Sequence, residues 1–348
     1  MTNTPLGCNV CAVPRVLVTG ASGFIGANVA RVLREHGRTV RALVRATSDR
    51  SNLNGLEVEI AEGDLRDPLA VLRAVRGCDE VYHVAAEYSF WSKRPRDVYG
   101  SNVDGTRNVM EACLRHSVPR VVYTSTVGTV GLAAVDGSDL RARDERTPLA
   151  PGQISGHYKR SKFEAERRVL EYASRGLPVV IVNPSAPIGP WDRKPTPTGQ
   201  IIVDFMRGKM PAYLDTGLNV VHVRDVALGH LLAATHGKVG ERYILGNENM
   251  TLARILETLA RLSGRPAPTL RIPYGVAYAA GWLSTTLSDF VTRRPPAIAL
   301  ESVKMAKRHM FFSTAKARFE LGLPQHPVEH AFLDALDWFS RNRYFAAA

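Results

Sequence analysis

Tyr158 and Lys162 stand four residues apart in the segment GHYKRSK, which opens a predicted helix over 157–175. Residues four apart share one face of a helix, so the phenol and the ammonium project together. A free tyrosine, with a pKa near 10, is a poor base at neutral pH, but a neighbouring ammonium favours the phenolate and lowers that pKa. The pair therefore indicates proton transfer, in which Tyr158 takes a proton from an alcohol or returns one to a ketone.

A hydroxyl-rich segment, YTSTVGTVG over 123–131, follows the fifth predicted strand and precedes that helix. A hydroxyl from this segment would hold the substrate oxygen in the same cradle as the phenol, as part of a preorganised polar site. Lys159 and Arg160 fall on other faces of the helix, where we expect solvated charge. His157 has no assigned role.

The segment VLVTGASGFIG places Gly20, Gly23 and Gly26 at G-x-x-G-x-x-G spacing between a predicted strand and a predicted helix. Gly20 permits a sharp turn, Gly23 lets the backbone approach a pyrophosphate, and Gly26 lets the helix pack closely on the sheet. The free N–H groups and positive dipole at the helix N-terminus then meet the phosphates. The segment predicts a dinucleotide cofactor.

The residues at the end of the second predicted strand indicate whether the cofactor is NAD(H) or NADP(H). NAD binders usually carry an acid there for the ribose 2′-OH. This strand instead ends ALVRAT, so that Arg45, helped by Arg41, would pair with a 2′-phosphate. NADP(H) is therefore favoured, with NAD(H) as the alternative. Asp64 is assigned to the adenine amino group, and Ala85 and Ala86 to the floor beneath the dinucleotide. The predicted cofactor contacts are Gly20, Ser22, Gly23, Phe24, Ile25, Gly26, Arg45, Asp64, Leu65, Ala85, Ala86, Tyr158, Lys162 and Pro184.

Strand and helix patterns alternate through the first half of the chain. Strands are predicted over 15–20, 39–45, 56–64, 80–86, 120–126 and 178–185, with helices over 24–37, 98–116 and 157–175. The alternation predicts βαβ units with right-handed crossovers, and therefore an α/β fold with a Rossmann-type, doubly wound parallel sheet. The turn and the catalytic pair then meet at the carboxyl edge of that sheet.

The regular alternation stops near Pro184, where a proline-rich segment begins. We divide the chain into a loose N-terminal segment (1–13), a cofactor-binding Rossmann domain (14–185) and a smaller, irregular substrate-binding lobe (186–348). A substrate would lie between the lobe and the strand ends. The segment AEYSFW predicts an apolar or planar pocket wall. The predicted substrate contacts are Tyr88, Phe90, Trp91 and Ser185.

Composition limits the remaining functions. The net charge is +12, but the basic residues are scattered, which argues against nucleic-acid binding. The Cys8–Cys11 pair precedes the first strand and is interpreted as part of a loose segment in a reducing compartment, with no metal site. No signal peptide is expected before residue 14. The apolar run over 275–291 is too polar to span a bilayer and is interpreted as a packed or interfacial helix. Peripheral membrane contact through this helix is therefore compatible with any enzymatic activity of the chain.

The motifs TGASGFIG, HVAA, NVDGTRN, YTSTVGTVG, YKRSK and NPSAPIGP occur in the order typical of extended (atypical) short-chain dehydrogenases/reductases. The chain resembles this class, within the NAD-dependent epimerase/dehydratase family. The resemblance implies that Thr126 is the catalytic hydroxyl, with Ser125 as the alternative, and that Asn102 orders the active-site network. It also implies a homodimer formed through helices such as 98–116 and 157–175.

Within the family, segments from about residue 14 onward, among them VRALVRATSDRSNL, HYKRSKFEAE and LDTGLNVVHVRDVALGH, resemble the bacterial hopanoid-associated sugar epimerases, near the dihydroflavonol-4-reductases. This resemblance implies a cytoplasmic bacterial enzyme. One position departs from the pattern, because Leu218 stands where UDP-sugar epimerases carry an arginine that clamps the substrate diphosphate. Arg308 or Lys304 would have to replace it.

Three functions stay open. An epimerase oxidises and then reduces its substrate with its own bound cofactor, whereas a ketone reductase consumes one NADPH per turnover. The residues favour the reductase and the overall resemblance favours the sugar epimerase. A non-catalytic NADP-binding regulator is the third option, and the presence of Tyr158, Lys162 and Thr126 argues against it.

Overall fold

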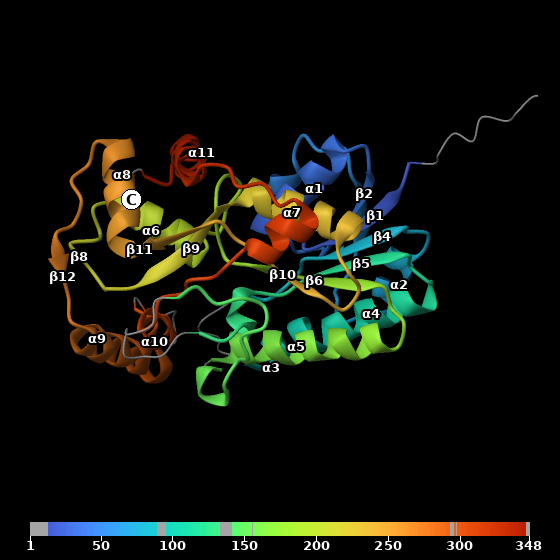
Figure 1. The fold of residues 1–348 in the computed structure, drawn as a ribbon, viewed down its shortest axis with the longest axis horizontal. Coiled ribbons are helices and arrows are strands. Elements are labelled where there is room, and N and C mark those ends of the chain that lie inside the picture. The colour runs from blue at the N-terminus through green and yellow to red at the C-terminus, as the bar shows by residue number, and fades with distance from the viewer. Residues whose placement is uncertain are drawn as a thin grey trace, which may run out of the picture.

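The computed structural model describes residues 13–88, 95–132, 141–154, 156–292, 296 and 298–345. It contains a seven-stranded sheet, a small three-stranded sheet and a two-stranded pair, with helices packed around them (Figure 1). The predicted α/β class is confirmed.

The large sheet has the order β3-β2-β1-β4-β5-β6-β10, and all its strands are parallel. The direction of winding reverses between β1 and β4, which places a cofactor site at the carboxyl ends of these two strands. Fully buried apolar residues fill the central strands, as expected for a parallel sheet covered on both faces. The strands are β1 (Arg15–Thr19), β2 (Thr39–Val44), β3 (Glu59–Glu62), β4 (Glu80–His83), β5 (Arg120–Thr124), β6 (Val179–Pro184) and β10 (Arg242–Leu245).

Two separate apolar cores cover the two faces of this sheet. On one face, α1 (Phe24–Glu35) and α7 (Val223–His236) pack against the strands. On the other, α2 (Pro68–Val75), α4 (Gly105–Arg115) and α5 (His157–Ser174) form the second core. The predicted helix over 98–116 is three successive segments: the end of α3 (Pro95–Tyr99), a π-helical turn over Gly100–Asp104, and α4.

The second lobe has its own core. The small sheet β11-β9-β7 packs with α6 (Pro197–Met206), α8 (Leu252–Ser263) and α11 (Val328–Arg341). Its strands are β7 (Ala186–Ile188), β9 (Gly217–His222) and β11 (Glu248–Thr251). Helix α8 begins at Thr251, whose hydroxyl accepts from the Arg254 N–H, and ends at the left-handed Gly264.

The chain after residue 185 does not stay in the second lobe. It returns to the large sheet and adds α7 and β10, so the predicted boundary at 185/186 does not separate the two parts in space. Local patterns predict β10 as a strand but do not identify its partner.

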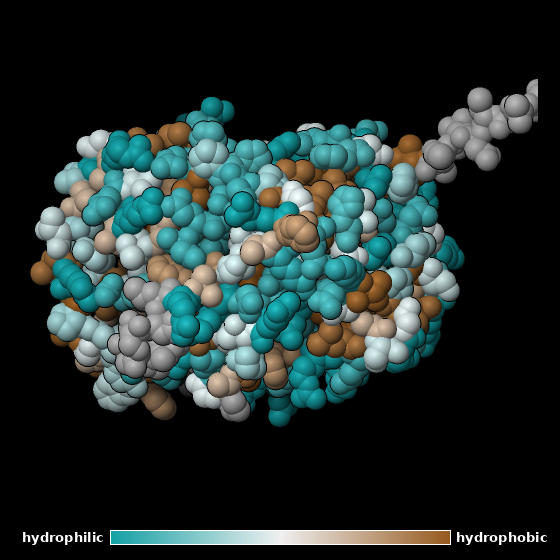
Figure 2. Space-filling model, viewed as in Figure 1, coloured by the Kyte–Doolittle hydropathy of each residue, from teal (hydrophilic) through white to brown (hydrophobic). Residues whose placement is uncertain are grey.

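At the far end of the second lobe, β8 (Ala212–Tyr213) pairs with β12 (Leu270–Arg271), followed by α9 (Tyr274–Leu287), a π-helical turn over Ser288–Thr292, and α10 (Leu300–Ala306) (Figure 1). No helix in the described part of the chain is both long enough and apolar enough to cross a bilayer. The face shown in Figure 2 is mostly hydrophilic, with separate apolar patches.

Candidate active site

The turn after β1 has the shape of a phosphate cradle. Gly20 has φ +69°, and a Cβ there would lie 2.7 Å from the Ala85 Cα. A Cβ on Gly26 would lie 2.1 Å from the Gly20 carbonyl oxygen, so the helix packs against the turn at a distance that only glycine permits. Gly23 is the N-cap of α1 and provides no side-chain cap, which leaves the first amides of the helix to bind an anion. These residues fit a dinucleotide pyrophosphate.

The predicted floor residues Ala85 and Ala86, and the predicted cofactor contacts Leu65 and Pro184, follow or end strands of the same sheet. The Ala85 N–H donates to Thr19 Oγ1 at 3.2 Å, which holds the chain after β4 beside the glycine turn. Ala86 is exposed, and Pro184 is buried at the end of β6. Leu65 lies after β3 with its side chain directed at Gly105 on α4, where an added Cβ would approach it to 2.8 Å.

The predicted adenosine end of the site is rich in arginine. Arg45 is exposed just after β2 and, within the described residues, forms no ion pair. Asp64 accepts from Arg66 Nε at 2.9 Å and from Nη2 at 2.7 Å, and these bonds hold the pKa of Asp64 below its ordinary value. The Arg45 charge also lowers the Asp64 pKa, which places Arg45 near this carboxylate.

The prediction that Arg41 helps Arg45 to bind a 2′-phosphate is wrong. Its guanidinium donates to Glu59 Oε1 at 2.9 Å and to the carbonyls of Ala74 and Arg76 at 2.7 and 2.9 Å. Residues four apart on a strand are separated by about 13 Å, so the Arg41 and Arg45 side chains contact groups at different places along β2.

Helix α5 presents the predicted catalytic pair. It begins after Gly156, which has φ +70°, and Tyr158 lies in its first turn. The Tyr158 ring meets the Tyr88 ring edge-on, with centroids 4.5 Å apart, so the predicted substrate-wall residue lies directly against the phenol. Burial raises the pKa of Tyr158 above its ordinary value.

Lys162 is buried beneath Tyr158, with 2% of its surface exposed. Its Nζ donates to the Tyr123 hydroxyl at 3.0 Å and to the Thr124 carbonyl at 2.7 Å. Burial lowers the pKa of Lys162 to about 7, against a smaller opposing effect of Glu166. The structure therefore differs from the simplest expectation, in which the ammonium lowers the phenol pKa: here the lysine is bonded to β5 and burial controls both groups.

The two candidate hydroxyls point to different surroundings, since successive residues of an extended chain face opposite ways. Ser125 is buried, and its hydroxyl donates to Glu166 in a short hydrogen bond. Thr126 is partly exposed, and its Oγ1 accepts from the Gly128 N–H at 3.1 Å.

Glu166 is a buried acid that the sequence reasoning did not identify. Its carboxylate also accepts from Thr129 Oγ1 at 2.8 Å and Asn183 Nδ2 at 3.2 Å, and it pairs with Arg242 at 3.3 Å. Its spacing of four from Lys162 was a signal, because it places Glu166 on the same face of α5.

Asn102 lies in the π-helical turn and is buried. Its amide donates to Ser161 Oγ at 2.9 Å and to the Glu87 carbonyl at 3.1 Å, and its oxygen accepts from the Glu87 N–H at 2.7 Å. Ser161 in turn donates to the Tyr158 carbonyl at 2.8 Å. Asn102 thus connects the chain after β4 to the first turn of α5, close to Tyr158.

The expectation of a solvated Lys159 is wrong. It is 7% exposed, and its Nζ donates to the Gln153 carbonyl at 2.8 Å. Burial, with a smaller effect of the Arg308 charge, lowers the pKa of Lys159 to about 8. The loop before α5 folds back over this side chain, which helical periodicity does not reveal. Arg160 is exposed, as predicted.

The predicted substrate residues are only partly placed. Ser185 follows β6, and its hydroxyl donates to the Leu245 carbonyl at 3.3 Å. Phe90, Trp91 and the Cys8–Cys11 pair lie outside the described residues. Leu218 lies on β9 between Met250 and Met310 and packs against the core of the second lobe.

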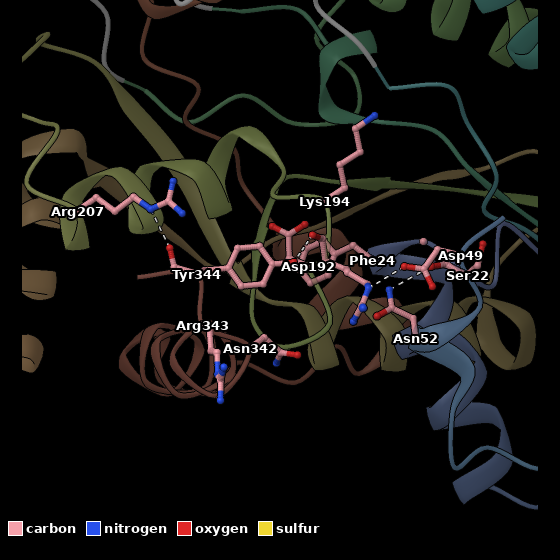
Figure 3. Close-up of a pocket in the computed structure, with 12 residues that line it drawn as sticks. Ser22, Phe24, Asp49, Asn52, Asp192, Lys194, Arg207, Asn342, Arg343 and Tyr344 are labelled. Atoms are coloured by element: carbon pink, nitrogen blue, oxygen red, sulfur yellow. Dashed lines mark hydrogen bonds and ion pairs between the residues drawn. The ribbon is translucent and has the colours of Figure 1, made fainter. Parts of the chain in front are cut away.

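A cavity of about 580 Å³ opens beside the phosphate turn (Figure 3). Its lining combines the start of α1 with basic groups from the second lobe, among them Lys194, Arg207 and Arg343. Asp192 and Tyr344 also line it (Figure 3). The predicted catalytic residues do not line it, and its position beside the glycine turn fits the phosphate end of a dinucleotide cleft.

A parallel sheet with a glycine cradle at its winding reversal, and a tyrosine–lysine helix beside it, defines an extended short-chain dehydrogenase/reductase. Residues 16–246 match the model of the NAD dependent epimerase/dehydratase family, and the chain belongs to that family.

Named relatives resemble the chain over nearly its full length. A putative dihydroflavonol 4-reductase of Synechocystis is 45% identical over 331 residues, covering 94% of this chain and 95% of the relative. Sterol demethylase protein B of Methylococcus capsulatus is 38% identical over 324 residues, covering 93% and 97%. The crystal structure of a nucleoside-diphosphate-sugar epimerase from Pseudomonas aeruginosa superposes with a TM-score of 0.79 at 28% identity, covering 97% and 100%. The chain is an NAD(P)-dependent oxidoreductase of this family.

Proposed function

We propose that the protein is an NADP(H)-dependent reductase of a ketone on an apolar, ring-containing substrate. The observation that carries this proposal is Leu218: the position that would clamp a sugar diphosphate holds an apolar side chain packed against the second lobe. A diphosphate there would lack a charge-assisted bond of about 1.5–3 kcal/mol. Relatives named for a dihydroflavonol and a sterol support an apolar substrate.

The chain's own groups suit proton delivery to a ketone. When bound in the glycine cradle, a nicotinamide cofactor would supply the hydride for the carbonyl carbon. The Tyr158 phenol is protonated at neutral pH, and burial raises its pKa further above the ordinary value; it donates that proton to the substrate oxygen as negative charge develops there. Thr126 accepts from Gly128, which leaves its hydroxyl proton for the same oxygen. Lys162 has two protons bonded to β5 and a third for the nicotinamide ribose.

Turnover against a substrate panel tests this function. We expect steroid ketones and flavonoid ketones to consume NADPH in a one-to-one ratio with alcohol formed, and nucleoside-diphosphate sugars to be neither reduced nor epimerised. Product should carry deuterium when the cofactor is deuterated at the transferred position. Turnover of nucleoside-diphosphate sugars alone would overturn the proposal. Cofactor binding without turnover of any ketone would favour the non-catalytic regulator.

Arg45 tests the cofactor preference. Arg45→Ala should weaken NADP(H) binding about tenfold and leave NAD(H) affinity within about twofold, since an exposed charge-assisted bond to the 2′-phosphate is lost. Titration of both cofactors by fluorescence measures this. Arg34→Ala is the matched control, because its guanidinium is already bound to Glu57 and neither residue is a predicted cofactor contact. Equal NADP(H) affinity in Arg45→Ala and wild type would show that Arg45 does not read the phosphate.

A sugar-nucleotide epimerase is the second candidate, and the position of Arg308 favours it. The Arg308 carbonyl accepts from Thr216 Oγ1 at 3.4 Å, so the chain at Arg308 runs beside the start of β9, near Leu218. Its guanidinium would then replace the missing arginine. Interconversion of two sugar-nucleotide epimers with no net NADPH consumption, lost in Arg308→Leu, would establish this candidate.

A further inference from the structure

Helix α9 exposes apolar side chains at the end of the second lobe. No charged residue occurs from Ile272 to Ser288. Of the fifteen large apolar side chains exposed in the described chain, seven lie between residues 276 and 298, so exposed apolar groups are concentrated in this segment. The α9 surface consists of Val276, Tyr278, Trp282, Leu283, Leu287, Phe290 and Ile298.

The orientation of α9 is the reverse of that in an ordinary surface helix. Ala277 and Gly281 are its buried residues and face α10, where a Cβ on Gly281 would lie 3.0 Å from Val303. The hydroxyls of Ser284 and Thr285 also point inward and accept from the Ile298 and Leu300 N–H groups at 3.2 and 2.9 Å. The helix therefore bonds to the protein through small and polar groups and turns its large apolar groups outward.

Cations border this surface. Lys304 is exposed on α10 and Lys307 directly after it, and Lys307 Nζ lies 5.4 Å from the centre of the Tyr274 ring. Tyrosine and tryptophan with adjoining lysines are the groups that prefer the interface between lipid headgroups and acyl chains. At fourteen residues, α9 is too short to span a bilayer and suits a position in its plane.

We propose that the α9 surface docks the protein on an anionic lipid bilayer. A second copy of the chain is the less suitable occupant, because a two-fold contact through α9 would bring the two lysine borders together. Anionic headgroups are complementary to that border, and the net charge of +12 acts in the same direction.

Docking would also place the active site beside the membrane. Helix α10 leads from α9 toward α5, and a Cβ on Gly156, at the start of α5, would lie 3.0 Å from the carboxyl carbon of Glu301 (Figure 1). An apolar substrate dissolved in the bilayer would then enter near Tyr158. This last step rests on the proposed function, whereas the docking does not.

Vesicle co-sedimentation of the full chain, with no substrate present, tests the docking alone. Wild type should bind phosphatidylcholine vesicles containing phosphatidylglycerol and bind pure phosphatidylcholine far less. Trp282→Ser/Leu283→Ser should reduce binding at least about tenfold, because two apolar anchors are removed.

Lys304→Glu/Lys307→Glu should reduce vesicle binding about fivefold or more per lysine, and high salt should reproduce this loss. The matched control is Phe319→Ser/Leu333→Ser, two exposed apolar residues elsewhere that should not alter binding.

Retained NADPH binding by each variant shows that it is folded. Absence of wild-type binding to anionic vesicles at low salt would overturn the proposal, as would equal binding by the Trp282/Leu283 variant. A concentration-dependent dimer that this variant loses, without vesicle binding by wild type, would assign the surface to self-association instead. Because ketone reduction is measured separately with dispersed substrate, failure of the proposed function would leave the docking result intact.

Discussion

Three residues on one stripe of α5, Tyr158, Lys162 and Glu166, are spaced four apart but have very different surroundings. Glu166 is bonded to hydroxyls and an amide and pairs with Arg242, which satisfies its carboxylate. Tyr158 is partly exposed and meets the Tyr88 ring. The comparison suggests a division of labour in which the satisfied end of the stripe holds the sheet and helix together, while the open end is left for a substrate.

Lys162 lies between these two ends and shares features of both. It is as buried as Glu166, yet its bonds to the Tyr123 hydroxyl and the Thr124 carbonyl use only two of its three protons. A buried ammonium without an ion pair costs stability, and proteins retain such groups mainly at functional sites.

The largest effect on kcat should come from a substitution at the open end of the stripe, at Tyr158. Tyr158→Phe removes the proton donor and should lower kcat by about 10²–10⁴-fold, while NADPH affinity and the free energy of unfolding stay nearly unchanged. Steady-state kinetics and cofactor titration measure this. Tyr172→Phe on the same helix is the control, since its hydroxyl bonds Glu111 away from the site. Activity surviving in Tyr158→Phe would remove the phenol from the mechanism.

Substitutions of the neighbouring hydroxyls of Thr126 and Ser125 test this difference between the two ends of the stripe. Thr126→Ala should lower kcat about 10²-fold through loss of a donor to the substrate oxygen. Ser125→Ala should instead lower the free energy of unfolding by about 1–2 kcal/mol, because it removes a buried bond to Glu166, and should change kcat only a few-fold. Kinetics and urea denaturation of both variants provide the comparison. The reverse pattern would make Ser125 the catalytic hydroxyl.

Local signals in the sequence predicted most of the large sheet and of the open end. The glycine spacing before α1 and the Tyr158–Lys162 spacing depend on residues near each other in the chain, so they can be interpreted without a structure. The predicted strands were found with ends shifted by a few residues, as were two of the helices, whereas the predicted helix over 98–116 is divided by a π-helical turn. The catalytic roles of these residues remain predictions.

Long-range contacts account for what was missed. Glu166 occurs in the charged run KFEAERR and looks like a solvent-exposed acid until Asn183 and Arg242 arrive from two distant strands. Lys159 is buried by a loop, and β10 joins the large sheet after the chain has passed through the second lobe. Helical or strand periodicity contains no information about such partners.

A substitution at the satisfied end of the stripe, at Glu166, should change the stability of the protein rather than its catalytic rate. Glu166→Gln replaces a carboxylate that accepts three hydrogen bonds and pairs with Arg242, so it should lower the free energy of unfolding by about 1.5–3 kcal/mol. Urea denaturation measures the loss. Glu171→Gln, which alters an exposed pair with Arg168 on the same helix, should stay within about 0.5 kcal/mol. A large loss of kcat at unchanged stability would instead make Glu166 part of the open end.

A gradual pH effect should come from Lys162. Burial lowers its pKa from 10.5 to about 7, so between these values the unfolded chain binds a proton that the native protein does not. Stability therefore rises with pH across this window, by at most about 1.4 kcal/mol per pH unit for one proton. Below pH 7 both states hold the proton, and the full cost of burying the charge is present.

Lys162→Met removes this contribution. Its free energy of unfolding relative to wild type should be most favourable below pH 7 and should fall steadily toward pH 10.5. Urea denaturation at a series of pH values gives the difference, with the exposed Lys209→Met as a control that should show no such slope. A difference independent of pH would mean that Lys162 keeps its ordinary pKa in the native protein, and would then place it with the satisfied end of the stripe.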